Sequence, residues 1–227
     1  MTLADRLADA QQRIAAAAAS ANRDPEGIKL IVVTKNHPIK LVFDLLDLGV
    51  RDFGENRDQE AAPKAAEVRA TSPISHRWHF IGQLQSNKVK SVVTYADSIH
   101  SLDRQSLLDS LGRATVERPT PLDVFIQLNL TDDPGRGGIQ PSALVPFAEN
   151  VLAHTGLNLV GVMGVAALDN NLDRDFSAIR AASQLLQTLR PEATLISAGM
   201  SEDFETAIAY GATHLRIGSA ITGKRQY

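Results

Sequence analysis

Lys35 is the residue whose position most strongly suggests chemistry. It follows the apolar run 28–34 and is followed at once by Asn36-His37-Pro38. The carboxyl end of a buried strand is where α/β proteins place their functional groups. A lone lysine there is more often simply solvated. Near another cation and away from water, however, its amine loses its proton more readily and becomes a nucleophile toward an aldehyde.

A second segment, Ser197-Ala198-Gly199-Met200, has the pattern of a strand that turns into a helix. Ser201 is the expected N-cap of that helix. A helix start approached through a glycine-containing turn presents free N–H groups to an anion, commonly phosphate. Taken alone, this segment could equally be a plain turn between a strand and a helix.

A third segment, 214–221, places an arginine beside a glycine and a serine. Strand alternation puts Leu215 and Ile217 on one face and Arg216 and Gly218 on the other. An inward guanidinium needs partners, and Ser219 adds further donors. We therefore expect Arg216, Gly218 and Ser219 to contribute to a phosphate and heterocycle site, with a structural arginine–carboxylate pair as the alternative.

A lysine nucleophile and a phosphate site at one end of a barrel indicate pyridoxal 5′-phosphate held by Lys35 as a Schiff base. Asn56, which ends the second predicted strand, can donate to or accept from substituents of the ring. Its alternative role is that of a turn-forming residue before a helix. The histidines do not indicate a metal site, because the spacing of His76 and His79 points them to opposite faces of a strand.

The elements that position these residues alternate along the whole chain. Eight short β-branched runs are expected as strands, at 28–34, 50–54, 78–82, 98–100, 124–130, 159–165, 194–197 and 214–217. Helices are expected at 38–48, 57–69, 84–95, 103–117, 141–154, 173–189 and 201–210, after an N-terminal helix within 3–21.

This alternation predicts an α/β fold, a single (β/α)₈ TIM barrel with an additional N-terminal helix. The rival, a doubly wound open sheet, would carry a glycine-rich fingerprint after its first strand, and 32–36 contains no glycine. No linker interrupts the pattern, so residues 1–227 are expected to form one domain, with 131–138 as a long loop over one face of the barrel.

Composition narrows the function classes. The chain has 227 residues, a formal net charge of −3 and no cysteine. Without concentrated positive charge, nucleic acid is not an expected partner. Without cysteine there is no disulfide and no thiol catalysis. No apolar run is long enough to cross a membrane and the start is not a signal peptide, so a cytoplasmic protein is expected.

Taken together and in order, these segments resemble the YggS/PROSC family of pyridoxal phosphate homeostasis proteins. The segment Trp78-His79-Phe80-Ile81-Gly82 adds strongly to that resemblance, which covers essentially the whole chain. It implies a barrel like the N-terminal domain of alanine racemase (fold type III of pyridoxal phosphate proteins), with Lys35 as the aldimine lysine and Arg216 facing the pyridine nitrogen. It assigns the phosphate to Ser197, the Gly199–Met200 backbone, Gly218 and Ser219.

The resemblance leaves two functions to weigh: a carrier or buffer in vitamin B6 homeostasis, and an amino-acid racemase. Racemisation needs a second acid–base group, which alanine racemase supplies as a tyrosine from an additional domain. Tyr95 and Tyr210 end helices at the far face of the barrel, and Tyr227 is the last residue. We therefore expect a carrier without substantial catalysis, monomeric, whose partners are pyridoxal phosphate and the apoenzymes that use it.

Overall fold

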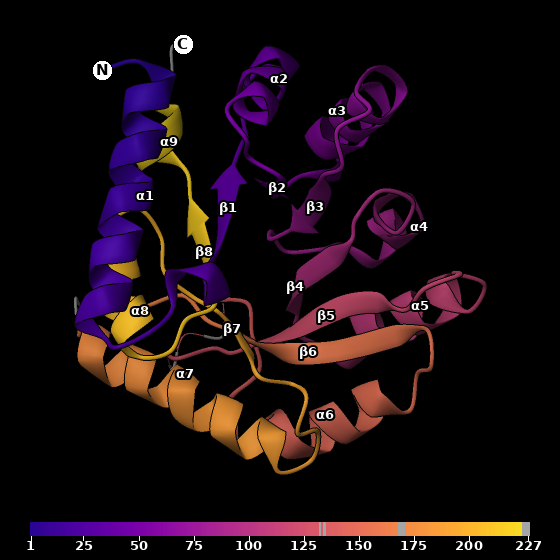
Figure 1. The fold of residues 1–227 in the computed structure, drawn as a ribbon. Coiled ribbons are helices and arrows are strands. Elements are labelled where there is room, and N and C mark those ends of the chain that lie inside the picture. The colour runs from indigo at the N-terminus through magenta and orange to yellow at the C-terminus, as the bar shows by residue number, and fades with distance from the viewer. Residues whose placement is uncertain (132, 134, 168–170, 224–227) are drawn as a thin grey trace.

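A closed barrel of eight parallel strands forms the centre of the molecule, as the computed structural model shows (Figure 1). The model describes residues 1–131, 133, 135–167 and 171–223. Every strand pairs with its neighbour in sequence, and β8 returns to pair with β1. The strands are β1 (Lys29–Val33), β2 (Asp52–Glu55), β3 (Arg77–Phe80), β4 (Ser98–Leu102), β5 (Leu122–Gln127), β6 (Leu157–Met163), β7 (Leu195–Ser197) and β8 (His214–Ile217). The predicted (β/α)₈ fold is therefore confirmed.

Helices cover the outside of the barrel (Figure 1). They are α1 (Leu3–Ser20), α2 (Ile39–Asp47), α3 (Asp58–Thr71), α4 (Val89–Val92), α5 (Gln105–Thr115), α6 (Leu144–Leu152), α7 (Leu172–Gln187), α8 (Phe204–Ala209) and α9 (Ser219–Thr222). Short 3₁₀ turns, η1 (Pro25–Gly27), η2 (Ser86–Lys88) and η3 (Pro141–Ala143), precede β1, α4 and α6.

Several predicted helices are shorter than their sequence patterns suggested, and two of them matter for the site. The segment 84–95 contains only a 3₁₀ turn and the four-residue α4. The helix expected from Ser201 begins at Phe204, and Asp203 occupies the cap position. The prediction that Ser201 caps this helix is therefore wrong.

The barrel interior is filled by alternate side chains of the strands. A Cβ on Gly54 would lie 3.0 Å from Ile31 Cγ2 and 3.3 Å from Val33 Cγ2, so these three residues share the inner face. Ile31 pairs with Arg216 across the β1–β8 seam, which brings Arg216 beside the middle of β1. Strand alternation thus directs the arginine inward, as the sequence indicated.

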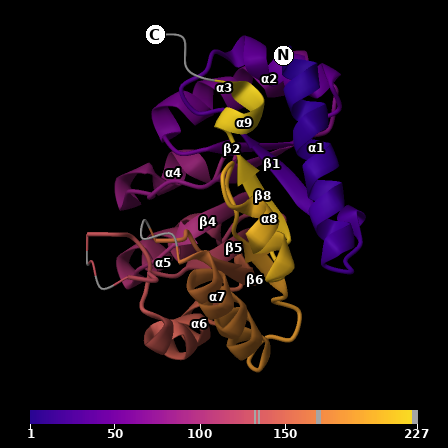
Figure 2. The same cartoon turned by 90° about the vertical axis from the view of Figure 1, so that its left-hand side faces the viewer.

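The N-terminal helix packs beside the final elements of the barrel, and Figure 2 shows α1 alongside α8 and α9. Thr2 and Asp5 form a capping box at its start. Arg6 Nε donates to the carbonyl of Ile221 at 2.6 Å. Arg13 donates to Glu205 Oε1 from Nε at 2.8 Å, and its guanidinium lies 4.7 Å from the ring centroid of Phe204. These contacts hold α1 against α8 and α9.

None of the helices in the described part of the chain is long and apolar enough to cross a bilayer.

Candidate functional site

A cavity of about 870 Å³ lies where the strands end, at the carboxyl-terminal mouth of the barrel. Five of the residues predicted to bind a ligand line it: Lys35, Met200, Arg216, Gly218 and Ser219. The other three, Asn56, Ser197 and Gly199, lie at the same end of the barrel but are not part of the cavity lining. Residues from three distant parts of the chain are thus brought to one site.

Lys35 lies half-buried just beyond the end of β1, and the residue before it, Thr34, is held by hydrogen bonds. Thr34 Oγ1 donates to Glu55 Oε1 at 2.8 Å. Lys64 Nζ donates to the same carboxylate oxygen at 2.7 Å and to the Thr34 carbonyl at 3.0 Å. Burial raises the pKa of Glu55, with the Lys64 charge acting against it. This Thr34–Glu55–Lys64 cluster fixes the backbone from which the Lys35 side chain extends.

Arg216 is buried, and two of its N–H groups donate to acceptors of the protein. Its NH1 group donates to Ser197 Oγ at 2.7 Å and NH2 donates to the Gly164 carbonyl at 3.0 Å. A guanidinium has five N–H bonds, so these two contacts leave donors for a ligand in the cavity. Burial lowers the pKa of Arg216 to about 10, and the nearby Asp203 carboxylate opposes that shift. The side chain is therefore still a cation at neutral pH.

Ser197 accepts a hydrogen bond from this arginine. Its side chain is fully buried, and its Oγ lies 2.7 Å from both Arg216 NH1 and His100 Nδ1. The hydroxyl group therefore has two protein partners. A direct contact between this hydroxyl and phosphate remains a prediction.

The turn after β7 is shaped by glycine. Gly199 has φ +92°, and a Cβ there would lie 2.8 Å from Ala207 Cβ. The N–H of Met200 donates to Asp203 Oδ1 at 2.5 Å. Burial raises the pKa of this carboxyl group. A phosphate that used the Met200 N–H would have to replace Asp203 as its acceptor.

Ser201 links the turn that follows β7 to the turn that follows β8, a contact that sequence reasoning did not anticipate. Its Oγ lies 3.3 Å from both Ser219 Oγ and the Ala220 N–H. Ser201 also lines the cavity. The sequence identified it only as a helix cap, because contacts between separate turns leave no trace in local spacing.

Asn56 has an unused oxygen. Its side-chain Oδ1 is buried and has no hydrogen-bond partner in the described structure. Gly82 makes room for the backbone of Asn56, since a Cβ on residue 82 would lie 2.3 Å from the main-chain carbonyl oxygen of Asn56. A buried acceptor without a partner is costly, so this oxygen is suited to a ligand donor or a bound water.

Other residues of the cavity wall had no sequence signal as ligands. They are Val33, His37, Ile81, Ala166, Ala167, Leu172, Glu202, Asp203, Thr222 and Gly223. Most lie in loops or short turns, where neither alternation nor helical spacing marks an inward side chain.

No cluster of metal-ligating residues occurs in the part of the chain that the structure describes. His76 Nδ1 lies 2.8 Å from the Ile74 carbonyl, whereas His79 Nε2 lies 2.8 Å from Asp52 Oδ1 in the barrel interior.

Comparison with known proteins gives a consistent result. Residues 6–226 match the family model described as "Alanine racemase, N-terminal domain". The chain is 37% identical to the "Pyridoxal phosphate homeostasis protein" of Escherichia coli K12, an alignment that covers 99% of this chain and 97% of that protein. It is 36% identical to the protein of the same name in Mycobacterium tuberculosis H37Rv, covering 99% and 93%.

Solved structures agree with these relatives. PipY of Synechococcus elongatus, in a structure with PLP bound, has a TM-score of 0.83 and 32% identity, covering 98% of this chain and 100% of that one. Alanine racemase of Corynebacterium glutamicum has a TM-score of 0.71 at 16% identity, and the match covers 99% of this chain but 62% of that one. The racemase likeness shows a shared fold alone.

Proposed function

Since the chain belongs to the family of pyridoxal phosphate homeostasis proteins, built on the alanine racemase N-terminal domain, we propose that it holds pyridoxal 5′-phosphate at Lys35. In this role it acts as a carrier or buffer of the cofactor, without substantial catalysis. The observation that carries the proposal is that Lys35 and Arg216 line one cavity. A nucleophilic amine and a buried cation with spare donors are what an anionic aldehyde requires.

Different residues of the site are assigned to different parts of the cofactor. When bound, pyridoxal phosphate supplies an aldehyde that bonds reversibly to a primary amine. Lys35 provides that amine, and the spare donors of Arg216 face the ring nitrogen. Asn56, with its unused oxygen, is assigned to a ring substituent.

The phosphate is assigned to the two turns that follow β7 and β8. Gly199 and Met200 belong to the first turn, and Gly218 and Ser219 to the second. Ser201, which contacts Ser219 and the Ala220 N–H, joins this set. Ser197 acts through Arg216, because its hydroxyl has that side chain as a partner.

The carrier is favoured over the racemase by the groups around the site. Arg216 keeps its proton at neutral pH and only donates hydrogen bonds, so the ring nitrogen that it faces stays unprotonated and the ring would be a weak electron sink. Alanine racemase also has an arginine here and compensates with its second acid–base residue, a tyrosine, so the absence of such a residue among the described residues around this cavity decides between the two functions. Tyr95 Oη donates to Asp58 Oδ1 at 3.3 Å and Tyr210 Oη donates to Asp173 Oδ1 at 3.0 Å, and neither residue lines the cavity. Tyr227 lies outside the described residues. The named relatives are also homeostasis proteins.

Reduction with borohydride tests the assignment of the lysine. The protein is incubated with pyridoxal phosphate, reduced and digested, and the modified peptide is identified by mass spectrometry. We expect the pyridoxyl group on Lys35 and a loss of covalent labelling in Lys35→Ala, which should keep weaker non-covalent binding. Labelling of Lys64 or Lys88 with Lys35 unmodified refutes the site.

Incubation with L-alanine in deuterated water tests the carrier role. We expect neither D-alanine nor exchange at the α-carbon beyond the rate with free pyridoxal phosphate. Exchange at enzymatic rates that depends on Lys35 supports the racemase instead.

The wider setting follows from the same proposal. The carrier works in the cytoplasm as a monomer, with residues 1–227 as one cofactor-binding domain, and passes the cofactor to apoenzymes that need it. Light scattering gives the mass in solution. Mixing the loaded protein with an apoenzyme in the presence of a scavenger for free pyridoxal phosphate separates direct transfer from release.

A further inference from the structure

Five polar side chains form one hydrogen-bonded chain through the interior of the barrel. Asp52 Oδ1 lies 2.8 Å from His79 Nε2, and His79 Nδ1 lies 3.0 Å from His100 Nε2. His100 Nδ1 lies 2.7 Å from Ser197 Oγ, which accepts from Arg216 NH1 at 2.7 Å. The members come from β2, β3, β4, β7 and β8, so the chain crosses the barrel from one wall to the other. It begins near the amino ends of the strands and ends at the cavity.

The direction of every hydrogen bond follows from Asp52. Lys29 Nζ donates to its second oxygen, Oδ2, at 3.1 Å. Burial alone would raise the pKa of Asp52, but the hydrogen bonds and charges of His79 and Lys29 outweigh burial, and the pKa is lowered. An ionised carboxylate only accepts hydrogen bonds, so His79 must carry its proton on Nε2.

The donors and acceptors in the rest of this hydrogen-bonded chain are then determined. A neutral imidazole with its proton on Nε2 accepts at Nδ1, so His100 must donate from its own Nε2. His100 Nδ1 is left as an acceptor, and the Ser197 hydroxyl donates to it. The Ser197 oxygen can therefore present a lone pair to Arg216 NH1.

Burial supports neutral histidines at both positions. His79 and His100 are almost completely buried, and burial lowers the pKa of both. Only a neutral imidazole offers one donor and one acceptor, which is what a chain of this kind needs. Phe125 stacks on His100 at 4.3 Å between ring centroids and holds its ring in place.

We propose that His79 and His100 are positioning residues for the cofactor: with Asp52 they hold the Ser197 oxygen toward Arg216 and so fix the guanidinium with its spare donors facing the cavity. Neither histidine lines the cavity. The proposal rests on the proposed function for the identity of the ligand, but the orientation of Arg216 can be measured without any ligand.

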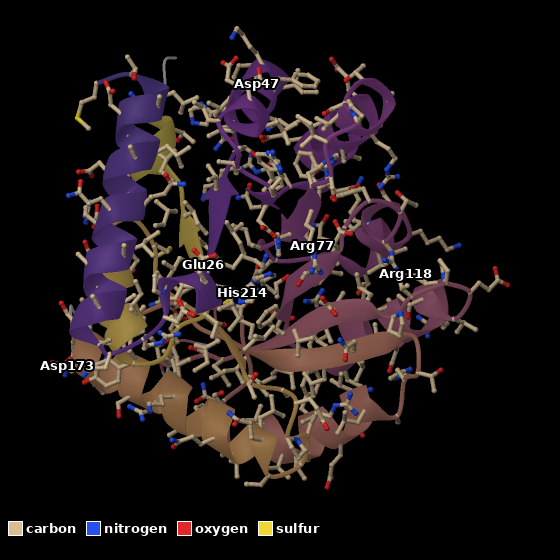
Figure 3. The ribbon with its side chains drawn as sticks, in the orientation of Figure 1. Glu26, Asp47, Arg77, Arg118, Asp173 and His214 are labelled. Atoms are coloured by element: carbon tan, nitrogen blue, oxygen red, sulfur yellow. The ribbon has the colours of Figure 1, made fainter. Side chains whose placement is uncertain are left out.

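His214 provides a matched contrast. It lies in the same interior, with ring centroids 6.3 Å from those of both His79 and His100. Its Nδ1, however, lies 2.9 Å from Thr213 Oγ1 and it is not a member of the chain. Figure 3 shows His214 near the middle of the ring of strands.

Side-chain nitrogen NMR of the ligand-free protein is the first test. We expect both His79 and His100 to be neutral with the proton on Nε2 at pH 7. We also expect slow rotation of the Arg216 guanidinium, since Ser197 holds NH1. A proton on Nδ1 of either histidine, or a charged ring, overturns the proposal.

Substitutions at His100 are the second test. His100→Leu removes both polar atoms, whereas His100→Gln keeps a donor and an acceptor separated by one carbon, as in the imidazole. We expect faster rotation of Arg216 and a roughly tenfold higher Kd for pyridoxal phosphate in the leucine variant, the loss of about one oriented hydrogen bond to a charged group. The glutamine variant should recover most of the affinity, and His214→Leu should bind as the wild type does.

The outcomes separate this proposal from the proposed function. Equal affinity and equal Arg216 rotation in wild type and His100→Leu sink the positioning role while leaving the Lys35 site intact. A wild-type protein that does not bind pyridoxal phosphate sinks the function, and the Arg216 rotation in the ligand-free variants then decides the positioning role. If His100→Leu does not fold, the comparison of His100→Gln with wild type and the tautomers of the wild type carry the test.

Discussion

At the scale of single residues, Lys35 depends on side chains that never reach the cavity. Thr34, Glu55 and Lys64 form a buried cluster in which one carboxylate oxygen accepts both hydrogen bonds. The second oxygen, Glu55 Oε2, is buried and has no partner within the described structure. If one donor is removed, no other group in the described structure replaces its hydrogen bond to the Glu55 carboxylate.

Removal of Lys64 should be costly for that reason. Lys64→Met leaves the Glu55 carboxylate buried without its cation, and we expect the free energy of unfolding to fall by about 3 kcal/mol. Urea titration followed by circular dichroism measures it. The matched control is Lys40→Met, which breaks an exposed pair with Asp44 and should change stability by less than about 0.5 kcal/mol. Equal effects of the two substitutions contradict the role given to the cluster.

At the scale of elements, close approach between strands explains a glycine in β6. A Cβ on Gly161 would lie 1.7 Å from the Leu195 carbonyl oxygen, on the neighbouring strand β7. Since β7 leads into the turn of Gly199, the spacing of these two strands affects the position of that turn, to which we assign part of the phosphate.

Gly161→Ala should therefore disturb the barrel. We expect a loss of ~2 kcal/mol or more, because backbone rather than a flexible side chain must move. Thermal unfolding measures the change. Gly27→Ala is the control, since nothing lies within 4 Å of its would-be Cβ, and it should be neutral or slightly stabilising. A Gly161→Ala protein as stable as Gly27→Ala would show that the strands separate easily.

The elements also show what sequence could reveal. β8 was predicted to the residue, because alternation of apolar and polar side chains is strong in 214–217. The segment 84–95 was overpredicted as a helix, because its apolar residues pack as a 3₁₀ turn followed by a single helical turn. Lys35 and Arg216 line one cavity, since the barrel brings all strand ends together, and their roles toward the cofactor stay a prediction. The hydrogen bonds that join His79, His100 and Ser197 were not predicted, because a contact across the barrel has no signature in sequence spacing.

At the scale of the whole molecule, the interior of the barrel holds three histidines with lowered pKa values. Burial lowers the pKa of His79, that of His100 far below its usual range, and that of His214 to about 3. In the unfolded chain each would titrate near 6.5. The unfolded state therefore binds more protons than the folded state as the pH falls below 6.5, so stability is present above that pH and is lost below it.

Acid should consequently destabilise the protein earlier than its carboxylates alone would. Each histidine that stays neutral in the folded protein adds a slope of about 1.4 kcal/mol per pH unit once its unfolded form is protonated. Urea titrations between pH 7 and 5 give the total slope. In His214→Leu it should be smaller by about 1.4 kcal/mol per pH unit, and a stability that does not change across this range would mean that the buried rings are already charged.

The seam between β1 and β8 has a consequence for the making of the protein. Lys35 follows β1 and Arg216 lies in β8, so the ribosome produces the two sides of the site near opposite ends of the barrel sequence. A nascent chain that ends before β8 has Lys35 but neither Arg216 nor the turn with Gly218 and Ser219. It also has two open sheet edges, on β1 and β7. The proposed site is therefore complete only after β8 has been made, and the same event closes the edges against pairing with other chains.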